Sequence, residues 1–260
     1  MDQLLQFTTP RVSPWPVAES KRKLQFKRVV VKLSGEALAS RESGLTIDTT
    51  TLSATAAELA EVRDNGIQVA VVVGGGNIFR GLRGASEGMD RAQSDYMGML
   101  ATVINSLALQ DALERRNVPT RVMTAIEISQ VAEPYIRRRA IRHLDRGHIV
   151  ICAAGTGNPY FSTDTAAALR AMEIRAEALF KATKVDGIYD RDPIRYSNAT
   201  LLQHVTYDRF LQDHLGVMDA TAVALCRDNG LPVRVFRMER GNIQRACLGE
   251  DVGTTISLEG

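Results

Sequence analysis

From residue 28 onward, short runs of apolar, β-branched residues alternate with amphipathic stretches. Strands that are apolar at every position are typical of sheets buried on both faces. Alternation of such strands with helices predicts an α/β fold with a largely parallel sheet. The expected strands are 29–31, 69–73, 120–123, 149–152, 176–180 and 233–236, and the expected helices are 49–64, 92–116, 135–145, 163–172 and 219–229.

The expected helix 92–116 carries an apolar stripe. Met97, Leu100, Ile104 and Leu107 follow one another at spacings of three and four residues. That spacing places them on one helical face, which we expect to point into the core. A face of this length could equally be shared with a second subunit.

Composition narrows the class of protein. The chain has 260 residues and a mass of 28.5 kDa, enough for one large domain or two small ones. Its 45% hydrophobic and 24% charged residues exclude global disorder. The longest apolar runs are too short to span a bilayer, so no membrane association is expected. Residues 28–260 carry 27 basic and 28 acidic side chains, a near-neutral balance that argues against nucleic-acid binding.

We interpret residues 1–27 as a loosely ordered tail and residues 28–258 as a single domain. The tail contains three prolines and no apolar run of seven residues, so it lacks the apolar region of a secretory signal. The three cysteines of the chain are widely spaced, which is typical of buried, reduced thiols. These features favour a cytoplasmic protein.

The most informative segment, residues 71–81, leads from a buried strand into three glycines, an asparagine and an arginine. Glycines let a backbone approach a ligand closely and present its N–H groups. A helix that begins after them adds partial positive charge, which favours anions. Arg80 would supply a permanent charge whose fork geometry suits phosphate oxygens. The position at the end of a parallel strand favours this interpretation over a simple turn.

Two further strand ends carry similar residues. Lys32 emerges from the first strand just before Ser34 and Gly35, where it could reach a transferring phosphate. The segment 155–164 combines two glycines with hydroxyl side chains and ends at Asp164, which could also simply cap the next helix. Three such loops on one sheet edge predict a pocket for phosphorylated ligands.

A fourth segment, residues 181–193, places Tyr189 between Asp186 and Asp192. An aromatic ring and a carboxylate suit a nucleotide, because one stacks on the base and the other accepts hydrogen bonds from ribose hydroxyls. The same residues are equally typical of an exposed turn, since Asp-Pro commonly initiates turns.

Several well-known phosphate-binding signatures are absent from the sequence. It contains no Gly-x-x-x-x-Gly-Lys-Ser/Thr segment, which excludes P-loop kinases and GTPases. No Gly-x-Gly-x-x-Gly follows a strand with an acidic residue about twenty positions later. The His-Arg-Asp and Asp-Phe-Gly elements of protein kinases are also missing.

Taken in order, the four segments resemble the amino-acid-kinase superfamily and, within it, the bacterial UMP kinase (uridylate kinase) family. The resemblance covers roughly residues 28–258. A Thr-Gly-Asn-Pro segment separates this family from relatives that phosphorylate carboxylates or carbamate. The most specific matching segments are 32–38, 74–81, 95–102, 155–164 and 181–187.

The resemblance implies a three-layer α/β/α sandwich, with UMP on the amino-terminal side and ATP, together with Mg²⁺, on the carboxy-terminal side. Family members are homohexamers that GTP activates and UTP inhibits. The UMP-binding residues that the resemblance implies are Gly75, Asp95, Thr156, Gly157, Asn158, Pro159, Tyr160, Phe161, Ser162 and Thr163. The implied ATP-binding residues are Lys32, Leu33, Ser34, Gly35, Gly76, Arg80, Thr183, Tyr189 and Asp192.

One segment departs from the family. In many relatives the residues after the Lys-Leu-Ser-Gly segment are richer in glycine and are tied to GTP activation. Here residues 39–45 contain a single glycine. This departure concerns the response to GTP and leaves the catalytic residues unchanged.

The expected reaction is in-line transfer of the ATP γ-phosphoryl group to the UMP phosphate. That acceptor is already an anion at neutral pH because its second pKa is about 6, so no general base is required. Lys32 and Arg80 would face the transferring group. Asp164 would orient Lys32 or a hydrated metal ion, and no metal site built by the protein alone is expected.

Two alternatives remain open at this point. The chain could be a kinase for an amino-acid carboxylate or for carbamate. It could also be a regulator that binds UMP or UTP without turnover and acts through a partner. Arg137, Arg138, Arg139 and Arg142 give the regulator some support, but an exposed or subunit-contacting face explains them better, since consecutive helical residues point in different directions.

Overall fold

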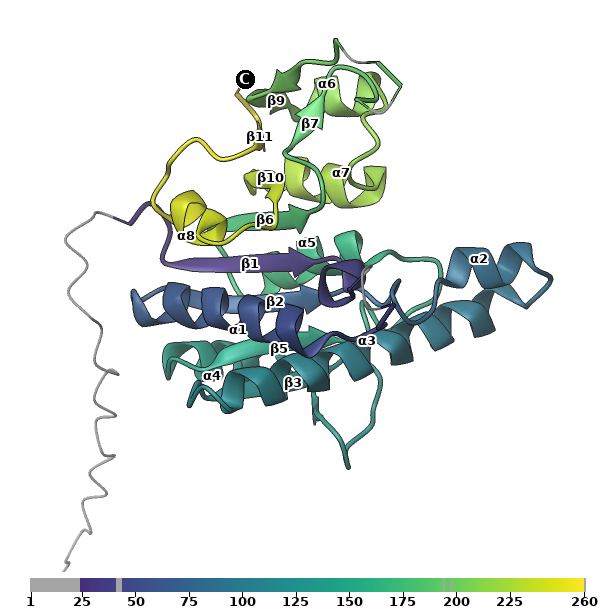
Figure 1. The fold of residues 1–260 in the computed structure, drawn as a ribbon, viewed down its shortest axis with the longest axis vertical. Helices are drawn as coiled ribbons and strands as arrows, with labels where there is room; N and C mark the ends of the chain where they lie inside the picture. Colours follow the sequence, from purple (N-terminus) through teal and green to yellow (C-terminus); the bar gives the residue numbers. More distant parts are fainter. Residues whose placement is uncertain (1–23, 41–43, 194, 197, 260) are drawn as a thin grey trace, which may run out of the picture.

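The computed structural model describes residues 24–40, 44–193, 195–196 and 198–259. Within these residues nine strands form one sheet that runs through the middle of the molecule (Figure 1). The strands lie in the order β4 (Glu133–Pro134), β3 (Thr120–Thr124), β5 (Ile149–Ala153), β2 (Gln68–Val73), β1 (Arg28–Leu33), β6 (Ala178–Thr183), β10 (Val233–Arg237), β11 (Thr254–Ser257) and β9 (His204–Thr206). β7 (Ile188–Tyr189) and β8 (Leu201–Leu202) form a separate antiparallel pair.

The predicted parallel sheet is confirmed. Every neighbouring pair from β4 to β10 is parallel, and only the step from β10 to β11 is antiparallel. β1 is central, since its Val31 lies opposite Val71 of β2 and Phe180 of β6. The carboxyl ends of β1, β2, β5 and β6 therefore meet at one edge of the sheet.

Helices cover both faces of the sheet and give three layers. α1 (Thr49–Asp64), α3 (Arg91–Glu114) and α8 (Asn242–Cys247) pack on one face, and α4 (Arg137–Asp145), α5 (Thr163–Glu173), α6 (Tyr207–Gln212) and α7 (Ala220–Asp228) pack on the other. Along β1, Val29 and Val31 belong to the first core and Val30 to the second. Continuous burial of this kind explains why the strands are apolar at every position.

The longer predicted helices are confirmed to within two residues at each end, and α1 matches its predicted range. The sequence pattern missed short elements. These include η1 (Gly35–Leu38), α2 (Gly81–Ser86), α6, α8 and the strands β4, β7, β8, β9 and β11. Elements of two to six residues carry too few positions to show a period, and packing rather than intrinsic propensity stabilises them.

The predicted apolar stripe on α3 does not point into the core. Met97, Leu100 and Ile104 are 41%, 48% and 49% exposed, so that expectation is wrong for these three residues. The helix instead buries Met99, Val103, Leu109 and Leu113 against the sheet. Both sets recur at helical spacing, and the sequence pattern alone does not distinguish which one faces the sheet.

The amino-terminal end of the described chain packs against the fold. Phe26 lies edge-to-face with Phe180, with ring centroids 5.8 Å apart, and the Gln25 N–H donates to the carbonyl of Cys247. Residues 1–23, which are most of the predicted tail, lie outside the described residues. So do residues 41–43, which belong to the segment 39–45 that departs from the family.

The three cysteines are free and buried, as expected. Among the described helices, none combines the length and hydropathy needed to cross a membrane.

Candidate active site

Four strand ends bring the predicted segments together. β1 ends beside Ser34 and Gly35, and β2 leads into the three glycines 74–76. β5 leads into the segment 155–163, and β6 ends at Thr183. Because these strands are parallel neighbours, their loops share one edge of the sheet, which is the usual place for a ligand in such folds.

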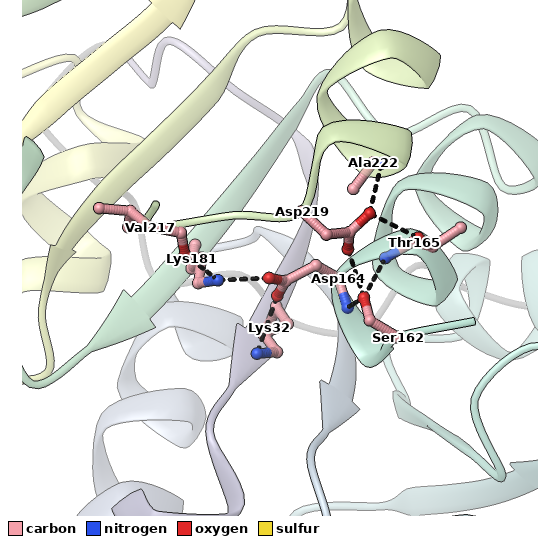
Figure 2. Close-up of polar contacts among 8 residues, drawn as sticks. All are labelled: Lys32, Ser162, Asp164, Thr165, Lys181, Val217, Asp219 and Ala222. Atoms are coloured by element: carbon pink, nitrogen blue, oxygen red, sulfur yellow. Dashed lines mark hydrogen bonds and ion pairs between the residues drawn. The ribbon is translucent and has the colours of Figure 1, made fainter. Parts of the chain in front are cut away.

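A carboxylate between two lysines forms the base of this edge. Lys32 Nζ, from β1, lies 2.8 Å from Asp164 Oδ1 on α5. Lys181, from β6, pairs with the other oxygen of Asp164 and also donates to the carbonyl of Val217 at 2.5 Å (Figure 2). The three charged side chains are only 10–12% exposed. These three side chains carry two positive charges and one negative charge, and the carboxylate of Asp219 also acts on Lys181.

Electrostatics keep Asp164 ionised. Burial alone would raise its pKa, but the charges of Lys32 and Lys181 outweigh that effect and hold the pKa below its ordinary value. Burial also lowers the pKa of Lys181, although Asp164 opposes that shift. An ionised carboxylate held by two lysines orients them and is a poor proton acceptor.

Asp164 does not cap α5, so the alternative role considered from the sequence is wrong. Ser162 is the cap, and its Oγ accepts from the N–H groups of Asp164 and Thr165 at 2.9 and 3.1 Å. Asp219, which caps α7, accepts from the Ser162 hydroxyl and from Thr165 Oγ1 at 3.0 Å (Figure 2). α7 and α5 are thereby joined directly behind the charged cluster.

The glycines allow a close approach between neighbouring loops. A Cβ on Gly35 would lie 2.5 Å from the carbonyl oxygen of Gly74, and one on Gly75 would lie 2.7 Å from that of Gly98. Both distances are shorter than real contacts, so larger residues would force the loops apart. The tight packing holds the first two loops against each other and against α3.

A cavity of about 520 Å³ lies between α3, the glycine loop and the segment 155–163. Asp95 on its wall accepts from Arg91 Nε and from the Tyr160 N–H, both at 2.8 Å. Arg91 was not predicted, although its place four residues before Asp95 on one helix is a recognisable signal. The predicted UMP residues that line the cavity are Gly75, Asp95, Thr156, Asn158, Tyr160, Phe161, Ser162 and Thr163, whereas Gly157 and Pro159 do not.

Gly76 and Arg80, predicted to bind ATP, line the same cavity. The Arg80 guanidinium pairs with one oxygen of Glu36, and Lys184 Nζ lies 2.5 Å from the other. These side chains are 27–59% exposed, so solvent screens the pairs. Glu36 thus holds Arg80, from the loop that follows β2, close to Lys184, which follows β6.

The other residues predicted to bind ATP lie at three different places in the structure. Leu33 is buried in the core, and its carbonyl accepts from the Gly74 N–H at 2.8 Å. Thr183 borders a cavity of about 1030 Å³ on the α1 side. Tyr189 and Asp192 border another of about 460 Å³, where the Tyr189 hydroxyl donates to Asp186 at 3.1 Å.

The family is decided by comparison with known proteins. The model of the amino acid kinase family matches residues 27–237. The chain belongs to the amino acid kinase family. A solved UMP kinase from Bacillus anthracis is 42% identical over 90% of this chain and 97% of its own, with a TM-score of 0.87.

Two more solved structures resemble the chain. A UMP kinase from Ureaplasma parvum is 36% identical over 89% of this chain and 98% of its own, with a TM-score of 0.83. A uridylate kinase from Archaeoglobus fulgidus is 26% identical over 88% and 99%, with a TM-score of 0.67. These similarities place the chain among the UMP kinases and confirm the predicted sandwich.

The sequence analysis missed Lys181, Asp219 and Glu36 as site residues. Lys181 directly follows the expected strand 176–180, where a lysine is ordinarily an exposed residue, but the structure extends this strand to Thr183. Asp219 starts a helix and has the ordinary signature of a cap. Nothing in the sequence places it near Ser162, which lies on another helix.

Proposed function

We propose that this chain transfers the γ-phosphoryl group of ATP to UMP, giving UDP and ADP, in pyrimidine nucleotide biosynthesis. Similarity to the two UMP kinases at 36% and 42% identity supports this activity. The observation that carries the proposal is the position of the cavity. Its wall is built from the glycine loop and the segment 155–163, next to the Lys32–Asp164–Lys181 cluster.

The chemistry requires positioning and charge neutralisation. The UMP phosphate is already anionic at neutral pH, so it attacks without losing a proton to the protein. The obstacle is the repulsion between two polyanions. Lys32 and Arg80 would oppose that repulsion at the transferring group. Asp164 would hold Lys32 in place, since its lowered pKa makes it a poor base.

UMP would occupy the cavity of about 520 Å³. Asp95 would accept hydrogen bonds from the ribose hydroxyls, held in orientation by Arg91. Those of the predicted residues from Thr156 to Thr163 that line the cavity would surround the base and phosphate. Tyr160 and Phe161 are 68% and 53% exposed, so their rings are available at the rim.

ATP would approach from the carboxy-terminal half. The segment Lys32 to Gly35, Gly76 and Arg80 would contact the phosphates, and Thr183, Tyr189 and Asp192 would contact the nucleoside. Tyr189 offers a ring for stacking, and Asp192 offers acceptors for ribose hydroxyls. The ion pairs of Glu36 with both Arg80 and Lys184 support a phosphate site at this point, because they hold two cations close together.

Magnesium would arrive bound to the ATP phosphates. No group of three or more His, Cys, Asp or Glu side chains suited to a metal ion occurs among the described residues. Both oxygens of Asp164 face lysines rather than an open position. We propose that the ion neutralises charge as part of the MgATP substrate.

We also propose a cytoplasmic homohexamer that responds to GTP and UTP. The exposed apolar side chains of Met97, Leu100 and Ile104 on α3 support a contact between subunits. The exposed arginines of α4 are consistent with such a contact too. Sedimentation of the purified chain, with and without each nucleotide, tests the assembly.

A coupled ADP-release assay with MgATP tests the activity. UMP, CMP, AMP, aspartate and carbamate serve as acceptors, each with and without GTP. Turnover confined to UMP is the expected result. Turnover with aspartate or carbamate alone would identify a different kinase, and tight UMP binding without ADP release would identify a regulator.

A further inference from the structure

Four polar side chains of α3 are buried, and two of them, Thr102 and Asn105, hydrogen-bond to the starts of the loops that follow β5 and β2. Thr102 is 2% exposed and Asn105 is fully buried. Neither belongs to the binding residues described above. A polar group is stable in such a place only when it is hydrogen-bonded, so its partners show what it holds.

Thr102 holds the start of the segment that follows β5. Its Oγ1 donates to the Met99 carbonyl at 2.7 Å and accepts from the Ala154 N–H at 2.8 Å. Ala154 has φ +60°, and Gly155 and Gly157 after it have φ +58° and +81°. Residues with a Cβ avoid this left-handed region, so Ala154 is strained at the point where its N–H donates to Thr102 Oγ1.

Asn105 holds the glycine loop that follows β2. Its Nδ2 donates to the Gly74 carbonyl and to Asn77 Oδ1, both at 2.7 Å. Asn77 Nδ2 donates in turn to Asn105 Oδ1 at 3.0 Å and to the Thr46 carbonyl at 2.8 Å. One turn of α3 therefore fixes two loops that arise from different strands.

Resting on the proposed function, we infer that Thr102 and Asn105 are positioning residues, which set the distance between the glycine loop and the UMP segment. The Thr102 side chain lines the UMP cavity, but its hydroxyl is already engaged by two protein partners. Thr102 therefore acts on UMP indirectly, through its hydrogen bond with the Ala154 N–H. An acceptor phosphate held between these loops depends on their spacing, and a misplacement of about 1 Å can cost a hundredfold in rate.

Thr102→Val tests the inference because valine keeps the shape and removes the hydroxyl. We expect KM for UMP to rise about tenfold. KM for ATP should stay within twofold, because the Thr102 hydroxyl makes no hydrogen bond to the residues predicted to bind ATP. Thr102→Ser restores the hydroxyl and should return KM for UMP to near its original value. Thr102→Ala replaces the valine variant if the latter fails to fold.

Ser106→Ala is the matched control. Ser106 is also fully buried on α3, and its hydroxyl donates to the Thr102 carbonyl at 2.7 Å without reaching either loop. We expect it to lower the thermal midpoint about as much as Thr102→Val does, with both KM values unchanged. If Thr102 contributed to stability alone, Thr102→Val and Ser106→Ala would have the same KM values.

Adding Ala154→Gly to Thr102→Val separates loop positioning from direct contact with UMP. Glycine adopts φ +60° without strain, so the double variant should recover part of the lost UMP affinity. Unchanged KM for UMP in Thr102→Val, or no recovery in the double variant, overturns the inference while wild-type turnover keeps the proposed function. A wild-type chain that makes no ADP from UMP overturns both.

Discussion

Replacing Asp164 by Asn removes one charge from the centre of the site and keeps the shape of the side chain. Lys32 and Lys181, at side-chain exposures of 11% and 10%, then lose the carboxylate between them, although Asp219 still acts on Lys181. Breaking a buried pair in this way costs about 3–5 kcal/mol. At roughly 2–4 °C per kcal/mol for a chain of this size, the thermal midpoint should fall by about 6–20 °C.

The same change should lower kcat, because Lys32 loses the group that orients it. Loss of one preorganised charge contact is worth about 10²–10³ in rate. ADP release at saturating UMP and MgATP measures it, at a temperature below the unfolding transition of the variant. Asp111→Asn is the control, since that acid is 57% exposed and its pair with Arg115 should contribute less than about 1 kcal/mol.

The pH dependence of stability gives a second signature of Asp164. Burial would raise the pKa of Asp164, but the charges of Lys32 and Lys181 lower it by more. Folding therefore lowers the pKa of Asp164 below its ordinary value of 3.8. The stabilisation is fully present above that pH and disappears as the pH falls through the folded pKa. The stability difference between wild type and variant should therefore narrow below pH 3.8. A midpoint within 2 °C of wild type, with kcat within about tenfold, would refute the reasoning.

Three further outcomes are expected. Lys32→Ala should lower kcat in the ADP-release assay by about 10²–10³ through loss of a charge at the transferring group, and a rate within tenfold of wild type would contradict that role. Asp95→Asn should raise KM for UMP and leave KM for ATP unchanged, so equal UMP affinity in a calorimetric titration would count against it. Burial raises the pKa of Cys152, Cys226 and Cys247 to about 12, so a thiol reagent at pH 8 should modify them only after unfolding. Rapid modification of the folded chain would show that they are accessible.

Local patterns made much of the fold and part of the site predictable. Lys32 and Gly75 stand at the ends of strands that are apolar throughout, and parallel neighbours must present those ends together. The contacts around Asp164 were harder to foresee. Lys181 and Asp219 reach that cluster only through the packing of β6 and α7, over distances in sequence that no short pattern spans.

The orientation of α3 illustrates a different limit. The helix carries apolar residues on more than one side, so Leu100 and Val103 are equally plausible core residues in the sequence. Contact with the sheet selects Val103 and leaves Leu100 half exposed. Packing also decides the short elements, which have no periodic signal to detect.

The central position of β1 has a consequence for how the chain folds during synthesis. β1 leaves the ribosome shortly before β2, with which it pairs, but its other neighbour, β6, ends only at Thr183. At about 5–20 residues per second, the roughly 150 intervening residues take about 8–30 s to translate. Throughout that interval one edge of β1 has no strand to pair with, and for most of it Lys32 lacks its partner Asp164. Slowing translation before residue 183 should therefore lengthen the exposure of that edge to chaperones or to other nascent chains.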